Sequence, residues 1–169
     1  MFQIELTKKY DVTEWKDDLK NVMKSAGRGN KTVFLFCDNQ IKKDSFIEDV
    51  NNLLNNGEVP NLFPPEELGE VLEIARNVAA DQEREIETTE DLLAFFTETI
   101  KRNLHVILCF SPIGDGFRNR IRNFPALVNC CTIDWFFEWP EEALKSVASQ
   151  FLNELPIDKQ VIEKCVETV

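Results

Sequence analysis

Residues 32–41 read Thr32-Val33-Phe34-Leu35-Phe36-Cys37-Asp38-Asn39-Gln40-Ile41. A continuous run of apolar, mostly β-favouring residues of this length is typical of a strand buried in the middle of a parallel sheet. The run ends abruptly at Asp38, so the acid lies at the carboxyl end of the predicted strand, where open α/β sheets place their ligands. An ordinary Asp-Asn turn would give the same pattern, and this stretch alone leaves both interpretations open.

Further strands and helices follow from the periodicity of the chain. Alternation over residues 2–6 predicts a half-exposed edge strand, and apolar runs predict buried strands over residues 105–110 and 128–135. Apolar residues at helical spacing, with proline, glycine and capping signals, predict helices between residues 11 and 27, 44 and 55, 64 and 78, 88 and 100, and 141 and 155, with a short helix or turn at 117–123 and a further helix starting at 156. This order predicts an α/β fold with a parallel sheet between layers of helices.

Size and composition narrow the class of protein. A chain of 169 residues is long enough for one domain with a full core, and its hydrophobic content of 43% and charged content of 29% are those of a soluble globular protein. The net charge of −11 argues against nucleic acid as a partner, because a phosphate backbone needs a basic surface. No window reaches the apolar length of a membrane span, and residues 1–9 lack the features of a signal peptide.

Cysteine, histidine and glycine offer little chemistry in this sequence. The five cysteines include no Cys-x-x-Cys pair and four lie in apolar runs, which indicates reduced thiols in a cytosolic compartment rather than disulfides or zinc. His105 is the only histidine, begins a predicted strand and has no recognisable catalytic partner. The turn Gly27-Arg28-Gly29-Asn30 follows a helix and enters a strand, the reverse of the order a phosphate-binding loop needs, so we interpret it as a helix stop.

Three segments together resemble a known family. They are His105-Val106-Ile107-Leu108-Cys109-Phe110-Ser111-Pro112, the Arg118-Asn119-Arg120-Ile121-Arg122-Asn123-Phe124-Pro125 run, and Cys131-Thr132-Ile133-Asp134-Trp135-Phe136 with the following residues to Leu144. They resemble the fourth AAA+ module of dynein heavy chains, more the axonemal than the cytoplasmic type. The strand before Asp38 and the segment from Asn55 to Glu67 agree, so the resemblance covers residues 2 to 155.

The resemblance implies an incomplete AAA+ core. Residues 1–155 would be a partial large subdomain, and residues 156–169 the start of the helical small subdomain or a tail. No Gly-x-x-x-x-Gly-Lys-Ser/Thr phosphate loop occurs in the sequence. By resemblance the chain begins at the family's second strand, so we expect a fragment or a truncated product. The strands ending at Ser111 and Asp134 would then flank an empty slot or close upon each other.

The resemblance also assigns candidate site residues. Asp38 occupies the Walker B position, which holds Mg²⁺ beside a bound nucleotide. Asn39 stands where hydrolysing members have a catalytic Glu, and an amide cannot accept the proton of the attacking water. Ser111 matches the polar sensor position at the end of the next strand.

Three arginines, Arg118, Arg120 and Arg122, fall in the arginine-finger region that serves the neighbouring module of a ring. Arg122, the nearest to Phe124-Pro125, is the first choice for the finger. A set of surface arginines paired with acids is the alternative.

The resemblance therefore predicts a regulatory module of a dynein heavy chain with ATP or ADP and Mg²⁺ as ligands, inactive as an ATPase on its own. Its partners would be neighbouring AAA+ modules of the same heavy chain, and, through the parent, microtubules and dynein light and intermediate chains. Its place would be the cytoplasm and cytoskeleton, in the cilium axoneme. The alternative is a non-catalytic α/β scaffold that acts through protein contacts, and an independent enzyme using Asp38 with a metal comes third.

Overall fold

The computed structural model describes residues 1–154, 156 and 158–167, and the chain forms two compact units, Met1–Thr132 and Ile133–Val169. In the part of the chain that is described, no helix is both long and apolar enough to cross a membrane. The expected subdomain boundary falls at residue 155, outside the described residues, and remains a prediction for the complete module.

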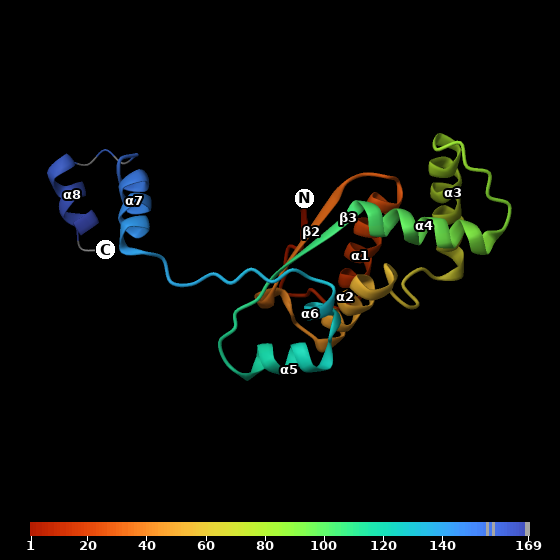
Figure 1. Cartoon of the computed structure of the whole chain (residues 1–169), viewed down its shortest axis with the longest axis horizontal. Coiled ribbons are helices and arrows are strands. Elements are labelled where there is room, and N and C mark those ends of the chain that lie inside the picture. Colours follow the sequence, from red (N-terminus) through yellow and green to blue (C-terminus); the bar gives the residue numbers. More distant parts are fainter. Residues whose placement is uncertain (155, 157, 168–169) are drawn as a thin grey trace. The chain divides into compact units, whose positions relative to one another are not determined.

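A parallel sheet forms the centre of the first unit, in the order β1 (Phe2–Gln3), β2 (Thr32–Cys37) and β3 (Leu104–Cys109) (Figure 1). β2 and β3 pair along their whole lengths, from Thr32 opposite Leu104 to Cys37 opposite Cys109. Their carboxyl ends therefore finish side by side. The predicted α/β class, a parallel sheet with flanking helices, is confirmed.

Four helices connect these strands, namely α1 (Val12–Gly27), α2 (Asp44–Asn56), α3 (Pro65–Asp81) and α4 (Thr89–Asn103). Their ends follow the sequence signals. Asp11 caps α1, since its carboxylate accepts a hydrogen bond from the Thr13 amide at 2.7 Å while Glu14 accepts one from the Asp11 amide. α2 stops at Gly57, whose φ of 71° places it in the left-handed region that glycine adopts without strain.

Aromatic packing joins the sheet to the helices. Phe34 and Phe36 of β2 point to one face, where the Trp15 ring of α1 lies 6.3 Å and 5.2 Å from them and stacks on Phe46 of α2 at 4.5 Å. All four side chains are fully buried, and burial of each ring removes a large apolar area from water. This face carries the core of the unit.

The opposite face of the sheet is more open. Val33 and Leu35 of β2 are only half-buried, and Ile107 of β3 is 47% exposed. The second layer of helices that we expected over this face is therefore not formed by the described residues of the first unit.

The strand predicted over residues 128–135 is wrong. The structure has instead a single turn, α6 (Ala126–Asn129), followed by residues without regular structure up to Pro140. Pro125 starts the turn, with its carbonyl accepting from the Asn129 amide at 2.9 Å. The short helix or turn predicted at 117–123 is confirmed as α5 (Asp115–Asn123). Because no strand ends at Asp134, the described residues do not form either of the strand arrangements expected at Ser111 and Asp134.

The missing strand has a physical reason. A strand needs a neighbour for its backbone groups, and β3 pairs only with β2 among the described residues. Trp135 and Phe136 stay 58% and 92% exposed, so no sheet buries the apolar pattern that favoured a strand. In the second unit, α7 (Glu141–Leu152) and α8 (Lys159–Glu167) correspond to the two helices predicted there. The predicted helix end at 155, and residues 157 and 168–169, lie outside the described residues.

The contact between α1 and α4 gives a stability prediction. A Cβ on Gly27 would lie 2.0 Å from Cε2 of Phe96, whereas a Cβ on Gly69 in α3 would meet nothing within 4 Å. Gly27→Ala should lower the free energy of unfolding by about 1–3 kcal/mol through overpacking. Gly69→Ala should raise it by about 0.5–1 kcal/mol through helix propensity. Urea unfolding followed by circular dichroism measures both, and equal effects of the two substitutions would contradict the packing described here.

Candidate functional site

The carboxyl edge of β2 and β3 brings two predicted site residues together. Asp38 follows β2 directly and Ser111 lies two residues beyond β3. The Asp38 Oδ2 atom accepts a hydrogen bond from the Ser111 backbone amide at 3.0 Å. Because the strands are parallel and in register, an acid and a hydroxyl distant in sequence lie at one point of the sheet edge.

A short helix after β2 fixes the direction in which the chain leaves Asp38. Residues Asp38–Gln40 form the 3-10 turn η1, and the Gln40 side chain is buried. Its Oε1 accepts from the Cys37 amide at 2.8 Å, and its Nε2 donates to the Ile4 carbonyl at 2.8 Å. Gln40 thus ties the acid-bearing turn to the chain that follows β1. The sequence analysis missed this role, although an amide between Asn39 and apolar Ile41 was a possible signal.

The other residues around Asp38 are accessible. Asp38 is half-buried, and Asn39 and Ser111 are exposed. The Ser111 hydroxyl accepts a long hydrogen bond from the Ile113 amide at 3.4 Å, so it remains able to contact a ligand. This arrangement presents one carboxylate, one amide and one hydroxyl on an open edge.

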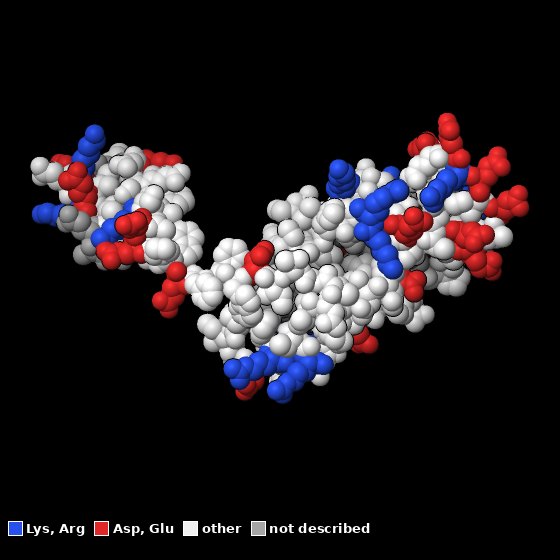
Figure 2. Space-filling view, in the orientation of Figure 1, with Lys and Arg blue, Asp and Glu red and all other residues white. Residues whose placement is uncertain are grey.

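The arginines predicted as a finger region lie on α5. Arg118 and Arg122 are exposed, while the half-buried Arg120 has its guanidinium 6.0 Å from the centre of the Phe110 ring. Within the described residues, none of the three forms an ion pair with an acid. Figure 2 shows the basic side chains gathered over α5. The assignment of these arginines to a finger region stays a prediction.

Two amides of α2 hold the chain after α5, and the sequence analysis missed both. Asn51 Oδ1 accepts from the Ala126 amide at 3.0 Å, and Asn55 Oδ1 accepts from the Cys130 thiol at 3.5 Å. The two asparagines stand one helical turn apart, so they form one polar row on α2. This row anchors α6 and so limits where α5 can lie.

Two cysteines lie at the strand ends that lead into the site, just before Asp38 and Ser111 in the sequence. Cys37 of β2 lies opposite Cys109 of β3 in the strand pairing. Neither cysteine forms a disulfide. Burial raises the pKa of the Cys37 thiol, and the neighbouring Cys109 thiol raises it further.

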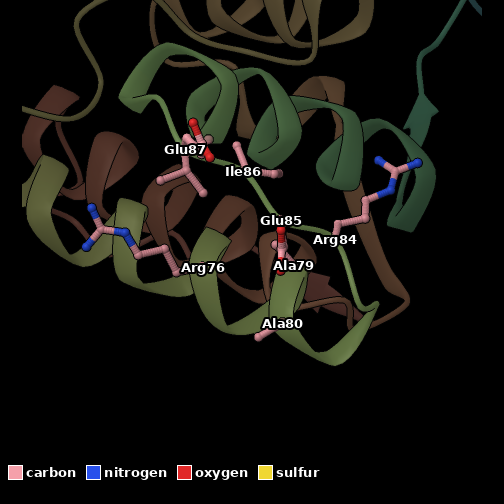
Figure 3. A pocket seen from close by; sticks show the side chains of 8 residues that line it. Arg76, Ala79, Ala80, Arg84, Glu85, Ile86 and Glu87 are labelled. Carbon is pink, nitrogen blue, oxygen red and sulfur yellow. The ribbon is translucent and has the colours of Figure 1, made fainter.

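A cavity lies elsewhere, over the segment that joins α3 to α4. It has a volume of about 370 Å³ and is lined by residues of α3, the connection and α4, namely Arg76, Ala79, Ala80, Arg84, Glu85, Ile86, Glu87 and Leu92 (Figure 3). Arg84 is engaged with Glu98 at 3.6 Å and with the Phe95 ring at 5.5 Å. None of the predicted site residues lines this cavity.

The donor set at the sheet edge suits a hard cation only in part. Asp38 offers carboxylate oxygens, the type of ligand that Mg²⁺ prefers, and Mg²⁺ keeps several waters and takes few protein ligands. No cluster of three or more His, Cys, Asp or Glu side chains occurs among the described residues. The Asp38 carboxylate therefore fits a magnesium ion that takes most of its other ligands from water or from a bound group.

A parallel α/β sheet with an acid at the carboxyl end of its central strand belongs to the class of open α/β folds, which place their ligands at this edge. Comparison with known families is more specific. The family described as "P-loop containing dynein motor region D4" matches residues 1–169. The chain belongs to this dynein motor family.

Individual relatives agree with the family. The chain is similar to dynein axonemal heavy chain 1 of Homo sapiens, with 52% identity over 92% of this chain. It is also similar to the dynein-1-beta heavy chain of the flagellar inner arm I1 complex of Chlamydomonas reinhardtii, with 50% identity over 98% of this chain. Dynein axonemal heavy chain 3 of Homo sapiens is 47% identical over 95% of this chain. The chain spans about 4% of the length of each of these relatives.

The two hydrogen bonds of Gln40 can be tested by removing its side chain. Gln40→Ala removes the hydrogen-bond partners of the half-buried Cys37 amide and the buried Ile4 carbonyl, so the free energy of unfolding should fall by about 1–3 kcal/mol. Asn39→Ala, at the exposed neighbouring position, should change it by less than about 0.5 kcal/mol. Urea unfolding measures both, and an effect of Gln40→Ala no larger than that of Asn39→Ala would refute the role of Gln40.

Proposed function

We propose that this chain is part of a regulatory AAA+ module of a dynein heavy chain that binds ATP or ADP with Mg²⁺. The main support is the hydrogen bond between Asp38 and the Ser111 amide at the carboxyl edge of the sheet. Asp38 and Ser111, to which the resemblance assigns the Walker B and sensor positions, are thus in contact, and this contact supports the proposal. Membership of the dynein motor family supports the same function.

Asp38 would contribute to the magnesium shell beside the β- and γ-phosphates, directly or through water. The bound ion would neutralise phosphate charge, and Asp38 would orient it from the end of β2. Ser111 would contact the terminal phosphate or a water near it through its hydroxyl. The turn held by Gln40 would keep Asp38 in place while nucleotide exchanges.

The residue after Asp38 argues against efficient hydrolysis. Asn39 offers an amide where a general base is needed, and an amide is too weak a base to accept a proton from the attacking water near neutral pH. The sequence contains no phosphate-loop lysine. We therefore propose that the 169-residue chain on its own does not hydrolyse ATP, and expect phosphate release with Mg-ATP to stay at background.

The arginines of α5 would act on the nucleotide of the neighbouring module, with Arg122 as the first choice. Arg122 is exposed and forms no ion pair among the described residues, so its guanidinium is available to a ligand outside its own unit. Arg120 is partly engaged with Phe110 and suits a supporting role.

The module would support microtubule-based movement as part of the heavy chain, with neighbouring AAA+ modules as direct partners and microtubules and light and intermediate chains reached through the parent. The axonemal names of the relatives support a place in the cilium axoneme. The second candidate is a non-catalytic α/β scaffold acting through protein contacts, favoured by the open sheet face around Ile107. Nucleotide binding by the complete module separates the two.

Asp38→Asn in the complete module tests the proposed function. The change removes the charge and keeps the shape, so the fold should persist while the dependence of ATP affinity on Mg²⁺ falls. Asp44→Asn, at the exposed start of α2, is the matched control and should leave this dependence unchanged. Nucleotide titration with and without Mg²⁺ measures the effect. Unchanged Mg²⁺ dependence in Asp38→Asn would mean that Asp38 only ends a strand.

Arg122→Ala in the complete heavy chain tests the arginine finger. Loss of a finger lowers phosphoryl-transfer rates by about 10³–10⁵, so hydrolysis at the neighbouring module should fall steeply while nucleotide binding by the Asp38 module stays intact. Arg102→Ala, an exposed arginine of α4, is the control. Steady-state ATPase assays measure the rate. An effect limited to nucleotide binding at the Asp38 module would show that Arg122 has another role.

A further inference from the structure

Cys37 and Cys109 are the last residues of β2 and β3 and lie opposite each other in the parallel pairing. Side chains of paired residues in a parallel sheet point to the same face, here the open face that also carries Ile107. Neighbouring strands lie about 4.8 Å apart, and a disulfide joins Cα atoms that are roughly 4.4–6.8 Å apart. The register thus brings two thiols within bridging distance.

Access favours a reaction between these two thiols. Both are free, Cys109 is exposed and Cys37 is half-buried beside it. A small oxidant in solution can therefore reach Cys109, and the first sulfur to be oxidised has a second thiol as its strand neighbour.

We propose that Cys37 and Cys109 are a thiol–disulfide pair that a hydroperoxide oxidises, and that the bond locks together the strand ends bearing Asp38 and Ser111. The sulfur of Cys109 attacks one peroxide oxygen, the O–O bond breaks, and a sulfenic acid and water (or an alcohol) are formed. The sulfur of Cys37 then attacks the sulfenic sulfur, the S–O bond breaks, and a second water leaves with the thiol proton. In sum two thiols lose two electrons and two protons to one peroxide.

The geometry also makes the bond reversible. In a parallel pair the two Cβ atoms keep about the strand spacing of 4.8 Å, slightly beyond the roughly 3.5–4.5 Å of relaxed disulfides. A strained, accessible disulfide is readily reduced, which is the behaviour of regulatory rather than structural bonds. Reducing thiols would return the pair to the free state.

The position of the pair gives the bond a consequence at the site. Asp38 directly follows Cys37, and Ser111 lies two residues beyond Cys109. The hydrogen bond from the Ser111 amide to Asp38 spans the gap between the same strand ends. A disulfide would keep these ends from separating, so the Ser111 amide should open less often.

The 169-residue chain treated with hydrogen peroxide tests the proposal. After blocking of remaining thiols and proteolysis without reductant, mass spectrometry should find the Cys37 and Cys109 peptides joined, and dithiothreitol should separate them. Hydrogen exchange of the Ser111 amide should slow severalfold in the oxidised chain. The same oxidation in urea should lose the preference for this pair, because the register no longer brings the thiols together.

Variants distinguish the bond from general oxidation. Cys37→Ser and Cys109→Ser should each abolish the joined peptide and the slower exchange, while Cys165→Ser in α8 should leave both unchanged. A sulfinic acid on Cys109 without a bridge, a link from Cys109 to Cys130 or Cys131, a bridge between two chains, or equal bridging in urea would each overturn the proposal. The readout needs no nucleotide, so it fails or succeeds independently of the proposed function.

Discussion

The register between β2 and β3 is the constraint on which the rest of this structure depends. Six residues of each strand are paired, from Thr32 with Leu104 to Cys37 with Cys109. A shift by one residue would turn Phe34 and Phe36 away from Trp15 and towards the open face, because side chains alternate along a strand. The aromatic core therefore fixes the register, and the register in turn sets Asp38 beside Ser111. Packing on one face of the sheet thus determines polar geometry at its edge.

Much of this could be predicted from the sequence because the decisive signals are local. The apolar run before Asp38 predicted β2, and the helical spacing after residues 11 and 44 predicted α1 and α2. Asp11 and Gly57 then set the ends of these helices through their own backbone conformations. The contact of Asp38 with Ser111 was not specified by either residue. It depends on the register of two parallel strands whose ends are aligned, which the structure shows.

What the sequence could not reveal depends on distant partners. Residues 128–135 have the composition of a strand, yet β sheet formation needs a second backbone, and their apolar side chains remain largely unburied. Gln40, Asn51 and Asn55 were missed for a related reason. The hydrophobic periodicity that predicts helices and strands does not indicate which backbone group a side-chain amide will bind. Their roles appear only when Ile4, Ala126 and Cys130 lie next to them.

The open face of the sheet links the candidate site to the second candidate function. Half-buried Val33 and Leu35 and exposed Ile107 form an apolar surface on the strands that end at Asp38 and Ser111. A partner packed on that surface would touch the same two strands whose relative position sets the Asp38–Ser111 hydrogen bond. The proposed nucleotide binding and the proposed protein contact would therefore use the same two strands. Because one pair of strands carries both surfaces, a change in spacing at one would alter the other, which is the physical requirement for coupling between two sites.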